Sequence, residues 1–423
     1  MNKTNRTIWE HPWGYEEGFY VAIGIALSGF LLQISIGNLQ LAEFQYPVNL
    51  IFGLLFIGVL LLLHFFAKKS AIVRWLSSVH ATVPAIVVLL SIVIILGIVP
   101  QFVAHASPHD IPHNLSGLFG WYQMTTSWTF IFISYFTLAI LGFTILKRTR
   151  RKFTWQDIGF YLNHVGLFLA FFGGMLGSAD VSRLRMNVTE GSVEWRAADE
   201  RENIVELPIA IQLDTFMIEE YPPKLMIVDL ETGKVLPENR PVSYVFEGEN
   251  KSTKLMGYNI DILSYLPNAA IMQDSLNSFA VPYHSEGATH AIKIRVSSEE
   301  MKDPVVGWVS NGSFMFPYSV VYIDKETAVA MPVQEVKKYS SHVQVFTDKG
   351  DAKEAVIEVN KPLTIDSWRI YQLSYDQSRG KYSRTSVFEL VRDPWLPIVY
   401  AGIIMLLAGS FYLFIVGPKK KKS

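Results

Sequence analysis

The 423-residue chain contains no cysteine, which excludes disulfides, thiolate metal sites, iron–sulfur clusters and covalent haem attachment through a C-x-x-C-H run. It also has no surplus of positive charge: 37 basic and 38 acidic residues give a formal net charge of −1, so nothing favours nucleic-acid binding. The patterns G-x-x-x-x-G-K-[ST], G-x-G-x-x-G, H-E-x-x-H and G-x-S-x-G are missing too. Nothing therefore marks a nucleotide site or a hydrolase of those classes.

Asp, Glu, Lys and Arg are missing from six long apolar segments, which define the class of protein. A helix needs about 20 apolar residues to cross the hydrocarbon core of a bilayer, and each segment has roughly that length. The first segment follows a polar stretch with three acidic residues, unlike a signal peptide, so we expect it to remain in the mature protein. The expected spans are residues 18–36, 48–66, 81–104, 128–146, 158–177 and 395–416.

Lys and Arg are missing from every second loop between these segments. Loops 37–47 and 105–127 contain neither residue, whereas loops 67–80 and 147–157 contain eight between them, and four lysines follow the last span. The positive-inside rule therefore predicts that both termini and the two basic loops lie in the cytoplasm. The large polar region after the fifth span is then predicted to lie outside the cytoplasmic (inner) membrane, in the periplasm of a Gram-negative cell.

Residues 179–393, the polar region, are predicted to form a β-rich extracytoplasmic domain. Alternating or β-branched runs such as KLMIVDL, HAIKIRVS and HVQVFTD are separated by turn signals such as ETGK and TDKGD. Such strands indicate an antiparallel sandwich or open barrel that is large enough to bury its own core. The predicted fold is thus a five-helix membrane domain (1–178), this β-rich domain, and a final span with a basic cytoplasmic tail (394–423).

His164 is the histidine placed deepest in a predicted span. It lies about six residues into the fifth segment, roughly 9 Å from its start at 1.5 Å per residue, where an ionisable group usually faces a partner or a polar cavity. At 100° per residue, small side chains fall on the opposite face and predict close helix packing there: Gly166, Gly173 and Gly177. Larger side chains fall near His164: Tyr161, Leu167, Phe168, Phe171 and Met175.

The His164 face suits a flat apolar ligand whose metal the imidazole binds axially, as haem iron is bound. A hydrogen bond from His164 to a neighbouring helix is the alternative interpretation. Three other histidines share an outer loop at a spacing of four residues: His105, His109 and His113. They are weaker candidates for a metal or haem site, because Pro108 and Pro112 disfavour a regular helix, and a solvated loop is the simpler expectation.

Several stretches resemble one known family, ResB (also called CcsB), of the system II cytochrome c biogenesis machinery. The matching stretches are GWYQMTTSWTFIFISYF from Gly120, NHVGLFLAFFGGMLGS from Asn163, RLRMNVTEGS from Arg183, and the run from VNKPLTIDSWRIYQLSYDQSRG through VRDPWLPIVYAGIIMLLAGSFYLF. The resemblance implies a CcsA (ResC) partner, with which ResB carries non-covalent haem b across the membrane and joins it to apocytochrome c. It also implies that His164 matches the family's intramembrane haem-ligating histidine.

The sequence departs from the family pattern in two respects. It has six predicted spans where the family's usual topology has four, and it lacks the tryptophan-rich segment and outer histidines of the CcsA half. We therefore expect a subunit of a cytochrome c synthase that depends on its partner for the covalent step. A membrane-anchored scaffold or sensor, with a protein-binding β domain and a purely structural His164, is the alternative. A small-molecule transporter is disfavoured, because the spans lack carboxylates and no inverted repeat is evident.

Overall fold

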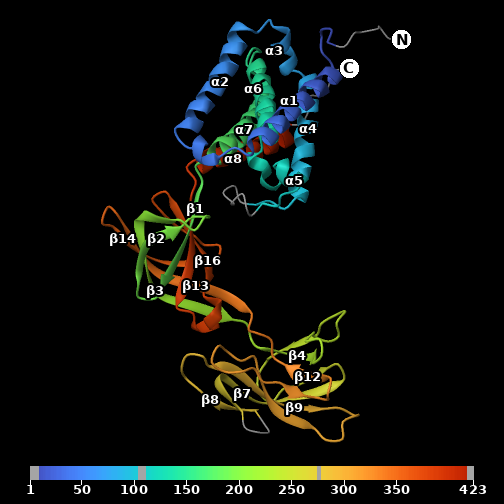
Figure 1. Cartoon of the computed structure of the whole chain (residues 1–423), viewed down its shortest axis with the longest axis vertical. Helices are drawn as coiled ribbons and strands as arrows, with labels where there is room; N and C mark the ends of the chain where they lie inside the picture. Colours follow the sequence, from blue (N-terminus) through green and yellow to red (C-terminus); the bar gives the residue numbers. More distant parts are fainter. Residues whose placement is uncertain (1–8, 103–110, 274–277, 417–423) are drawn as a thin grey trace.

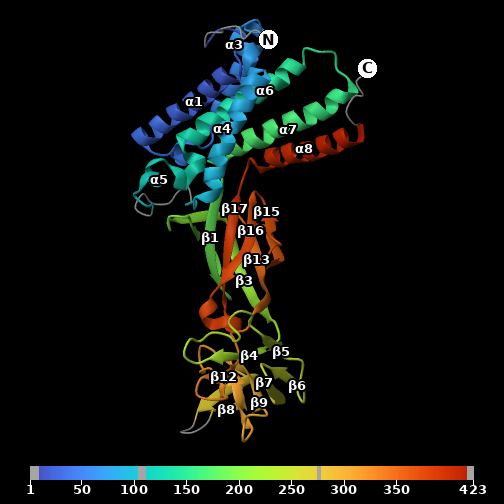
Figure 2. The same ribbon diagram turned by 90° about the vertical axis from the view of Figure 1, so that its right-hand side faces the viewer.

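The computed structural model describes residues 9–102, 111–273 and 278–416. Helices gather at one end of an elongated molecule, and two successive β lobes extend away from them (Figures 1 and 2). We call the lobe next to the helices the proximal lobe and the other the distal lobe. The polypeptide passes through the proximal lobe on its way to the distal lobe and again on its return to the last helix.

Among the described residues, six helices are long and apolar enough to cross a membrane, which confirms the predicted class. Their bounds are α1 (Tyr15–Ile36), α2 (Val48–Phe66), α4 (Val79–Ile98), α6 (Trp128–Arg148), α7 (Trp155–Gly177) and α8 (Leu396–Val416). Shorter helices lie in the loops: η1 (Leu41–Phe44), α3 (Ala71–Leu76), α5 (Leu115–Leu118) and η2 (Trp121–Thr126). The prediction that the third span continues to Ala104 was wrong. Pro100 forces the preceding residue, Val99, into an extended conformation that ends the helix.

Helices α7 and α8 pack against each other through glycines, as the sequence predicted for the face opposite His164 (Figure 2). A Cβ atom added at Gly166 would lie 2.7 Å from the carbonyl oxygen of Gly402, and one added at Gly402 would lie 2.6 Å from the carbonyl oxygen of Gly166. The two backbones therefore approach too closely for any side chain at either position. A Cβ atom added at Gly177 would likewise lie 2.7 Å from the ring of Trp395, the residue before α8.

The described part of the two lobes contains seventeen strands, in agreement with the predicted β-rich region. Their bounds are β1 (Ser182–Thr189), β2 (Val193–Ala198), β3 (Ile204–Glu220), β4 (Lys224–Asp229), β5 (Ser243–Val245), β6 (Ser252–Leu255), β7 (Tyr258–Gln273), β8 (Ser278–Pro282), β9 (Thr289–Ser297), β10 (Val305–Ser310), β11 (Val321–Tyr322), β12 (Thr327–Ala330), β13 (Val336–Thr347), β14 (Ala352–Glu358), β15 (Leu363–Ile365), β16 (Trp368–Tyr375) and β17 (Thr385–Arg392).

The proximal lobe is one antiparallel sheet in the order β14-β13-β3-β2-β1-β17-β16-β15. Strand β14 also lies beside β15 and β16, so the sheet curls toward a barrel around a single apolar core. Strands β1 and β17 pair along their whole length, from Ser182 opposite Arg392 to Thr189 opposite Thr385. Because β1 follows α7 and β17 precedes α8, this pair ties the lobe to both helices of the glycine-packed hairpin.

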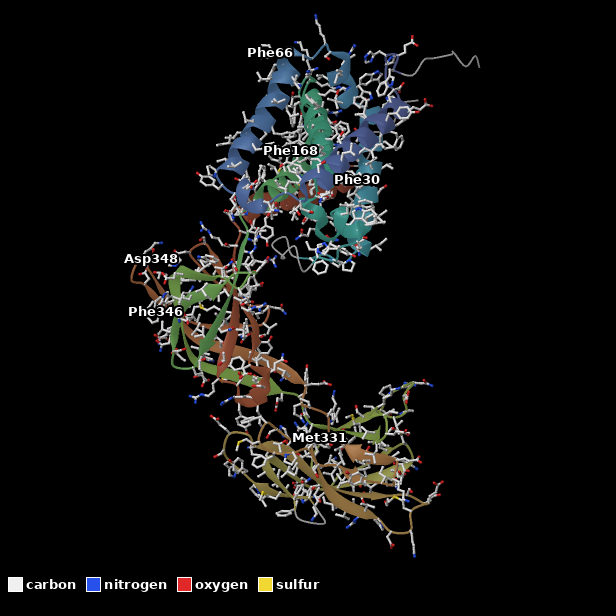
Figure 3. The ribbon with its side chains drawn as sticks, viewed as in Figure 1. Phe30, Phe66, Phe168, Met331, Phe346 and Asp348 are labelled. Atoms are coloured by element: carbon white, nitrogen blue, oxygen red, sulfur yellow. The ribbon has the colours of Figure 1, made fainter. Side chains whose placement is uncertain are left out.

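The distal lobe is inserted between β3 and β13. It contains a sheet in the order β10-β9-β7-β6, with β8 added to β7, and a smaller sheet in the order β11-β12-β4-β5. The two sheets enclose a second core that is separate from the core of the proximal lobe. Met331 belongs to this second core and lies at the side of the distal lobe that faces the proximal lobe (Figure 3). The β-rich region thus has two cores rather than the single sandwich or barrel that the strand spacing indicated.

Asp180 joins the membrane helices to the proximal lobe. Its carboxylate accepts hydrogen bonds from the Tyr46 backbone N–H at 2.8 Å, the Asn49 amide at 2.7 Å and the Trp395 indole N–H at 2.6 Å. Asn49 is fully buried and also donates to the carbonyl oxygen of Leu176. One acidic side chain therefore connects the loop before α2, α2 itself and the start of α8.

We expect Asp180→Ala to lower the stability of the purified chain by on the order of 3 kcal/mol or more, because three charge-assisted hydrogen bonds are lost, and one N–H of the Asn49 amide and the indole N–H of Trp395 lose their acceptors. Thermal unfolding in detergent, followed by tryptophan fluorescence, measures the change. Glu247→Ala is the matched control, since Glu247 is exposed and its side chain has no hydrogen-bond partner among the described residues. Equal melting temperatures for the two variants would show that Asp180 does not hold this junction.

Candidate functional site

His164 lies near the middle of α7 with one ring nitrogen already bonded. Its Nδ1 is 2.9 Å from the carbonyl oxygen of Phe160, one turn earlier, and the two rings stack with their centroids 3.9 Å apart. A carbonyl oxygen only accepts, so Nδ1 carries the hydrogen. Within the described residues, Nε2 has no hydrogen-bond partner. This is the arrangement of a metal-binding histidine, which donates one N–H to a carbonyl and keeps its other nitrogen for the metal.

The ring of Phe160, which stacks on His164, is in turn contacted near the start of α7, the end predicted to be cytoplasmic. The Arg148 guanidinium lies 5.3 Å from the centroid of the Phe160 ring and pairs with Asp157. Asp157 also accepts hydrogen bonds from the backbone N–H and the hydroxyl of Thr154, which cap the first turn of the helix. The position of the His164 ring therefore depends on a chain of contacts that begins at the α6–α7 loop.

The aromatic candidates on the His164 face lie in different surroundings. Tyr161 stacks on Phe153 near the start of α7, with ring centroids 6.1 Å apart. Phe168 lies among the helices (Figure 3) and packs on Phe172, with ring centroids 5.2 Å apart. Phe171 lines a cavity that neither Tyr161 nor Phe168 reaches. The three side chains thus share one side of α7, as predicted, but the structure does not gather them into one pocket.

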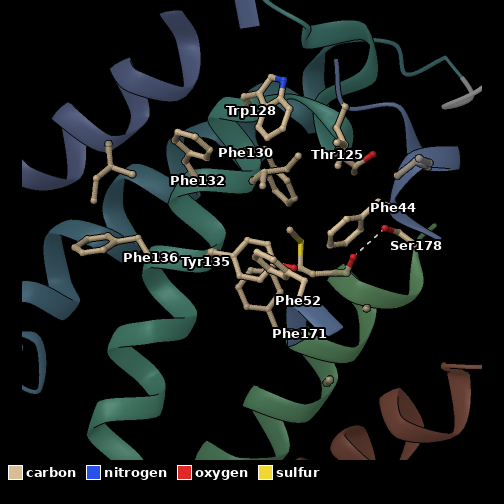
Figure 4. Close-up of a pocket in the computed structure, with 17 residues that line it drawn as sticks. Phe44, Phe52, Thr125, Trp128, Phe130, Phe132, Tyr135, Phe136, Phe171 and Ser178 are labelled. Atoms are coloured by element: carbon tan, nitrogen blue, oxygen red, sulfur yellow. Dashed lines mark hydrogen bonds between the residues drawn. The ribbon is translucent and has the colours of Figure 1, made fainter. Parts of the chain in front are cut away.

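The cavity has a volume of about 710 Å³ and lies beside the second half of α7, toward Ser178, after which the chain leads into β1 (Figure 4). Helix α7 contributes Ala170, Phe171, Gly174 and Met175 to its wall, Ser178 follows at its end, and the rest comes mainly from α6 and the α1–α2 loop. Aromatic rings dominate the lining: Phe44, Phe52, Trp128, Phe130, Phe132, Tyr135, Phe136 and Phe171. Such a wall suits a large, flat, apolar molecule.

One buried polar atom of the lining residues has no partner among the described residues. It is the indole nitrogen of Trp128, and a buried donor left in this way is costly. The cavity was not foreseen from the sequence. The available signal was the spacing of Trp128, Phe132 and Phe136, which places three aromatic rings on one side of α6.

The other histidine candidates are not placed beside His164. Residues 103–110, with the weak candidates His105 and His109, are outside them, so those predictions remain untested. His113 borders a shallow hollow beside α5. His64 lies 3.1 Å from the Arg150 guanidinium, which also donates to the carbonyl oxygen of His64. Within the described ranges, no three His, Asp or Glu side chains are grouped so that they could bind a metal ion.

Comparison with known protein families gives one match, in the β-rich part of the chain. Residues 316–385 match the model of the ResB-like family. The ResB-like segment begins in the distal lobe, at Phe316, and ends at Thr385, the first residue of β17. No curated protein matches the chain. The resemblance drawn from the sequence is thus confirmed over this segment, which includes the whole of the VNKPLTIDSWRIYQLSYDQSRG stretch.

The ResB-like segment and the His164 site lie in different parts of the molecule. The segment covers β11 to β16 and therefore contains strands of both lobes, whereas His164 and the aromatic cavity belong to the membrane helices. The connection between them runs through β17, which pairs with both β1 and β16 and continues into α8. The segment is therefore coupled to the helix hairpin that carries His164.

Proposed function

We propose that the chain is the haem-handling subunit of a system II cytochrome c synthase and works with a CcsA/ResC-type membrane partner. The ResB-like match supports a role in cytochrome c biogenesis. In this proposal haem is the transported substrate, and apocytochrome c is the acceptor outside the membrane. The chain itself contributes binding and orientation, because it has no cysteine and hence no redox thiol.

One observation carries the proposal: a histidine in a membrane span has its Nδ1 bonded to a backbone carbonyl while its Nε2 has no partner among the described residues. Haem iron takes such a nitrogen as an axial ligand. The ring is already oriented by Phe160, so little rotational freedom is lost when the iron binds. The opposite side of α7 is covered by α8, which leaves the His164 side for haem and the partner.

The described residues fit a site that two proteins share. Besides His164, no second histidine lies on the same side of α7, so we propose that the other axial ligand comes from the partner. The aromatic cavity begins at Ala170, six residues further along α7 and therefore about 9 Å away along the helix axis. We propose that haem passes from His164 toward this cavity, whose aromatic wall suits a porphyrin ring.

Absorbance of the purified complex tests this proposal. The chain should be co-expressed with a CcsA/ResC-type protein, purified through a tag on the chain, and examined for the Soret band of bound haem. We expect a Soret band that corresponds to about one haem per chain and that persists through washing with detergent. A purified complex with both subunits and no haem band would leave the alternative, a scaffold or sensor in which His164 only orients α7.

The proposal includes a membrane topology that follows from the Lys and Arg asymmetry. Both termini and the basic loops should be cytoplasmic, and both β lobes should be outside the inner membrane. Alkaline phosphatase fused near Glu231 should be active, while fusions after Arg150 and after Lys422 should be inactive. Green fluorescent protein at the same three positions should give the reverse pattern. An active phosphatase after Arg150 together with an inactive one near Glu231 would refute this orientation.

A further inference from the structure

The two β lobes meet around a polar cavity of about 290 Å³. The proximal lobe contributes Glu220, at the end of β3, and the turn η3 (Gln377–Tyr382). The distal lobe contributes residues 288–290 and 311–314, and the connection between the lobes adds residues 333–334. We call this space the interlobe cleft. It lies far from His164 in the fold, at the opposite end of the proximal lobe from the helices (Figure 1).

The cleft is bordered by direct contacts between the lobes. His290 of β9 places its Nε2 3.3 Å from a carboxylate oxygen of Glu220. On the other side, Arg379 of η3 lies 3.8 Å from the Glu286 carboxylate and stacks over the Phe314 ring, 5.9 Å from its centroid. The lobes are therefore held in one relative position, and the cleft between them has a defined shape.

Two hydrogen-bond donors in the wall of the cleft have no acceptor. The half-buried Lys381 ammonium makes no hydrogen bond with a described residue and lies 5.4 Å from the centroid of the Tyr382 ring. The side-chain N–H₂ of Gln334 is buried and has no hydrogen-bond partner among the described residues. Burial lowers the pKa of the Lys381 ammonium and the negative charge of Glu220 opposes this, so the charged form is only partly compensated in this wall.

The charged side chains that line the cleft have a small positive balance. Arg379 and Lys381 contribute two positive charges, and Glu220 contributes one negative charge that acts on Lys381 and lies beside His290. The partner of Arg379, Glu286, is not one of the lining residues. A carboxylate can accept from an ammonium and from an amide together, so it would satisfy both Lys381 and Gln334. The volume accommodates a short side chain rather than a large cofactor. Exposed apolar side chains at the rim, Phe314 and Val333, can contact the rest of an extended peptide.

We propose that the interlobe cleft binds the carboxylate of an acidic side chain in an extended protein segment, with Lys381 and Gln334 as the donors. Because Lys381 belongs to the proximal lobe and Gln334 to the interlobe connection, an occupied cleft also fixes the angle between the lobes. The inference does not depend on haem binding by His164, and it can fail or hold independently of that proposal.

Isothermal titration of the full-length chain in detergent tests the cleft. The probes are acetyl-Gly-Glu-Gly-amide, its glutamine analogue and sodium acetate. We expect saturable binding of the glutamate peptide, and binding at least about tenfold weaker for the glutamine analogue, because the charge-assisted hydrogen bonds are lost. Lys381→Met should weaken binding of the glutamate peptide by a similar factor, and Gln334→Leu should weaken it as well.

Lys325→Met is the matched control, since Lys325 is exposed on the distal lobe and has no ion pair among the described residues. It should bind the glutamate peptide as the unmodified chain does. Unmodified chain that shows no saturable binding, or Lys381→Met and Gln334→Leu variants that bind like the control, would overturn the proposal. Acetate that binds as tightly as the peptide would also overturn it, because the site would then serve free small anions rather than a protein segment.

Discussion

Cytochrome c maturation is expected only when the chain and a CcsA/ResC-type protein are present together. In a host that lacks both, the chain alone should insert into the membrane but produce no holocytochrome c. Co-expression should restore covalent haem attachment, measured by haem-staining peroxidase activity in gels, and the two proteins should co-purify. The reason is chemical: the chain lacks the tryptophan-rich segment and outer histidines of the partner, and it offers one histidine near the middle of a span, His164, where a six-coordinate iron needs two axial ligands.

The partner expressed alone is the control for this experiment, and it should also be inactive. A chain without residues 185–391 tests whether the β lobes are needed: we expect it to insert, since the six spans remain, but to give no detectable holocytochrome c. Strong maturation by the full chain in a host without any CcsA/ResC-type protein would contradict the assignment to a partner-dependent subunit.

Replacement of His164 by alanine is expected to remove most of the haem that co-purifies with the complex and to reduce maturation by tenfold or more. Loss of an axial ligand removes the strongest single bond between this chain and the iron. Haem should be measured by pyridine haemochrome absorbance per mole of chain, with the amount of co-purified partner quantified in the same sample. Because His164 is half-buried and its one hydrogen bond is to its own helix, the variant should still fold and bind the partner.

His80→Ala is a suitable comparison for this experiment. His80 lies at the start of α4, where its ring contacts Tyr15, and no other role is proposed for it. It should retain normal haem content, so that an effect of His164→Ala cannot be ascribed to the loss of any intramembrane histidine. Equal haem content in the two variants would show that His164 does not bind haem and has only a structural role in α7.

The membrane half of the fold was largely predictable because lipid imposes strict local rules. Apolar length and the lack of charge located all six spanning helices, and helical periodicity identified the glycine side of α7 before its partner helix was known. The predicted end of the third span was too late because the prediction followed the apolar run past Pro100. The effect of a proline on the preceding residue is also local, so the sequence contained the signal. The partner of the glycine side, α8, comes some 230 residues after Gly166, which no local rule can supply.

The β lobes were predictable as strands but not as an arrangement. Alternation identifies a strand such as β9, yet its pairing with β7 and β10 depends on contacts between residues that are distant in the chain. The division into two cores follows from where the chain crosses between lobes. It crosses at residues 221–223, which include two prolines, and again at residues 331–335. Both segments look like ordinary turns in the sequence.

The candidate site shows the same boundary between local and distant information. The sequence singled out His164 because depth in a span is a local property, and its bond to Phe160 lies within one helical turn. The cavity was missed because its wall combines α6 and α7 with the loop that carries Phe44. The unpaired donors of Lys381 and Gln334 were missed for the same reason, since only the fold brings η3 against the connection between the lobes.

Rescue by imidazole is the most direct measurement of the central claim that His164 binds haem iron. His164→Gly leaves a space in which free imidazole can occupy the vacated coordination position. The account predicts that the purified variant with its partner has a weak Soret band, that added imidazole restores the band, and that the same imidazole restores cytochrome c maturation in cells. A His164→Gly complex with a full Soret band and normal maturation before any imidazole is added would contradict the account.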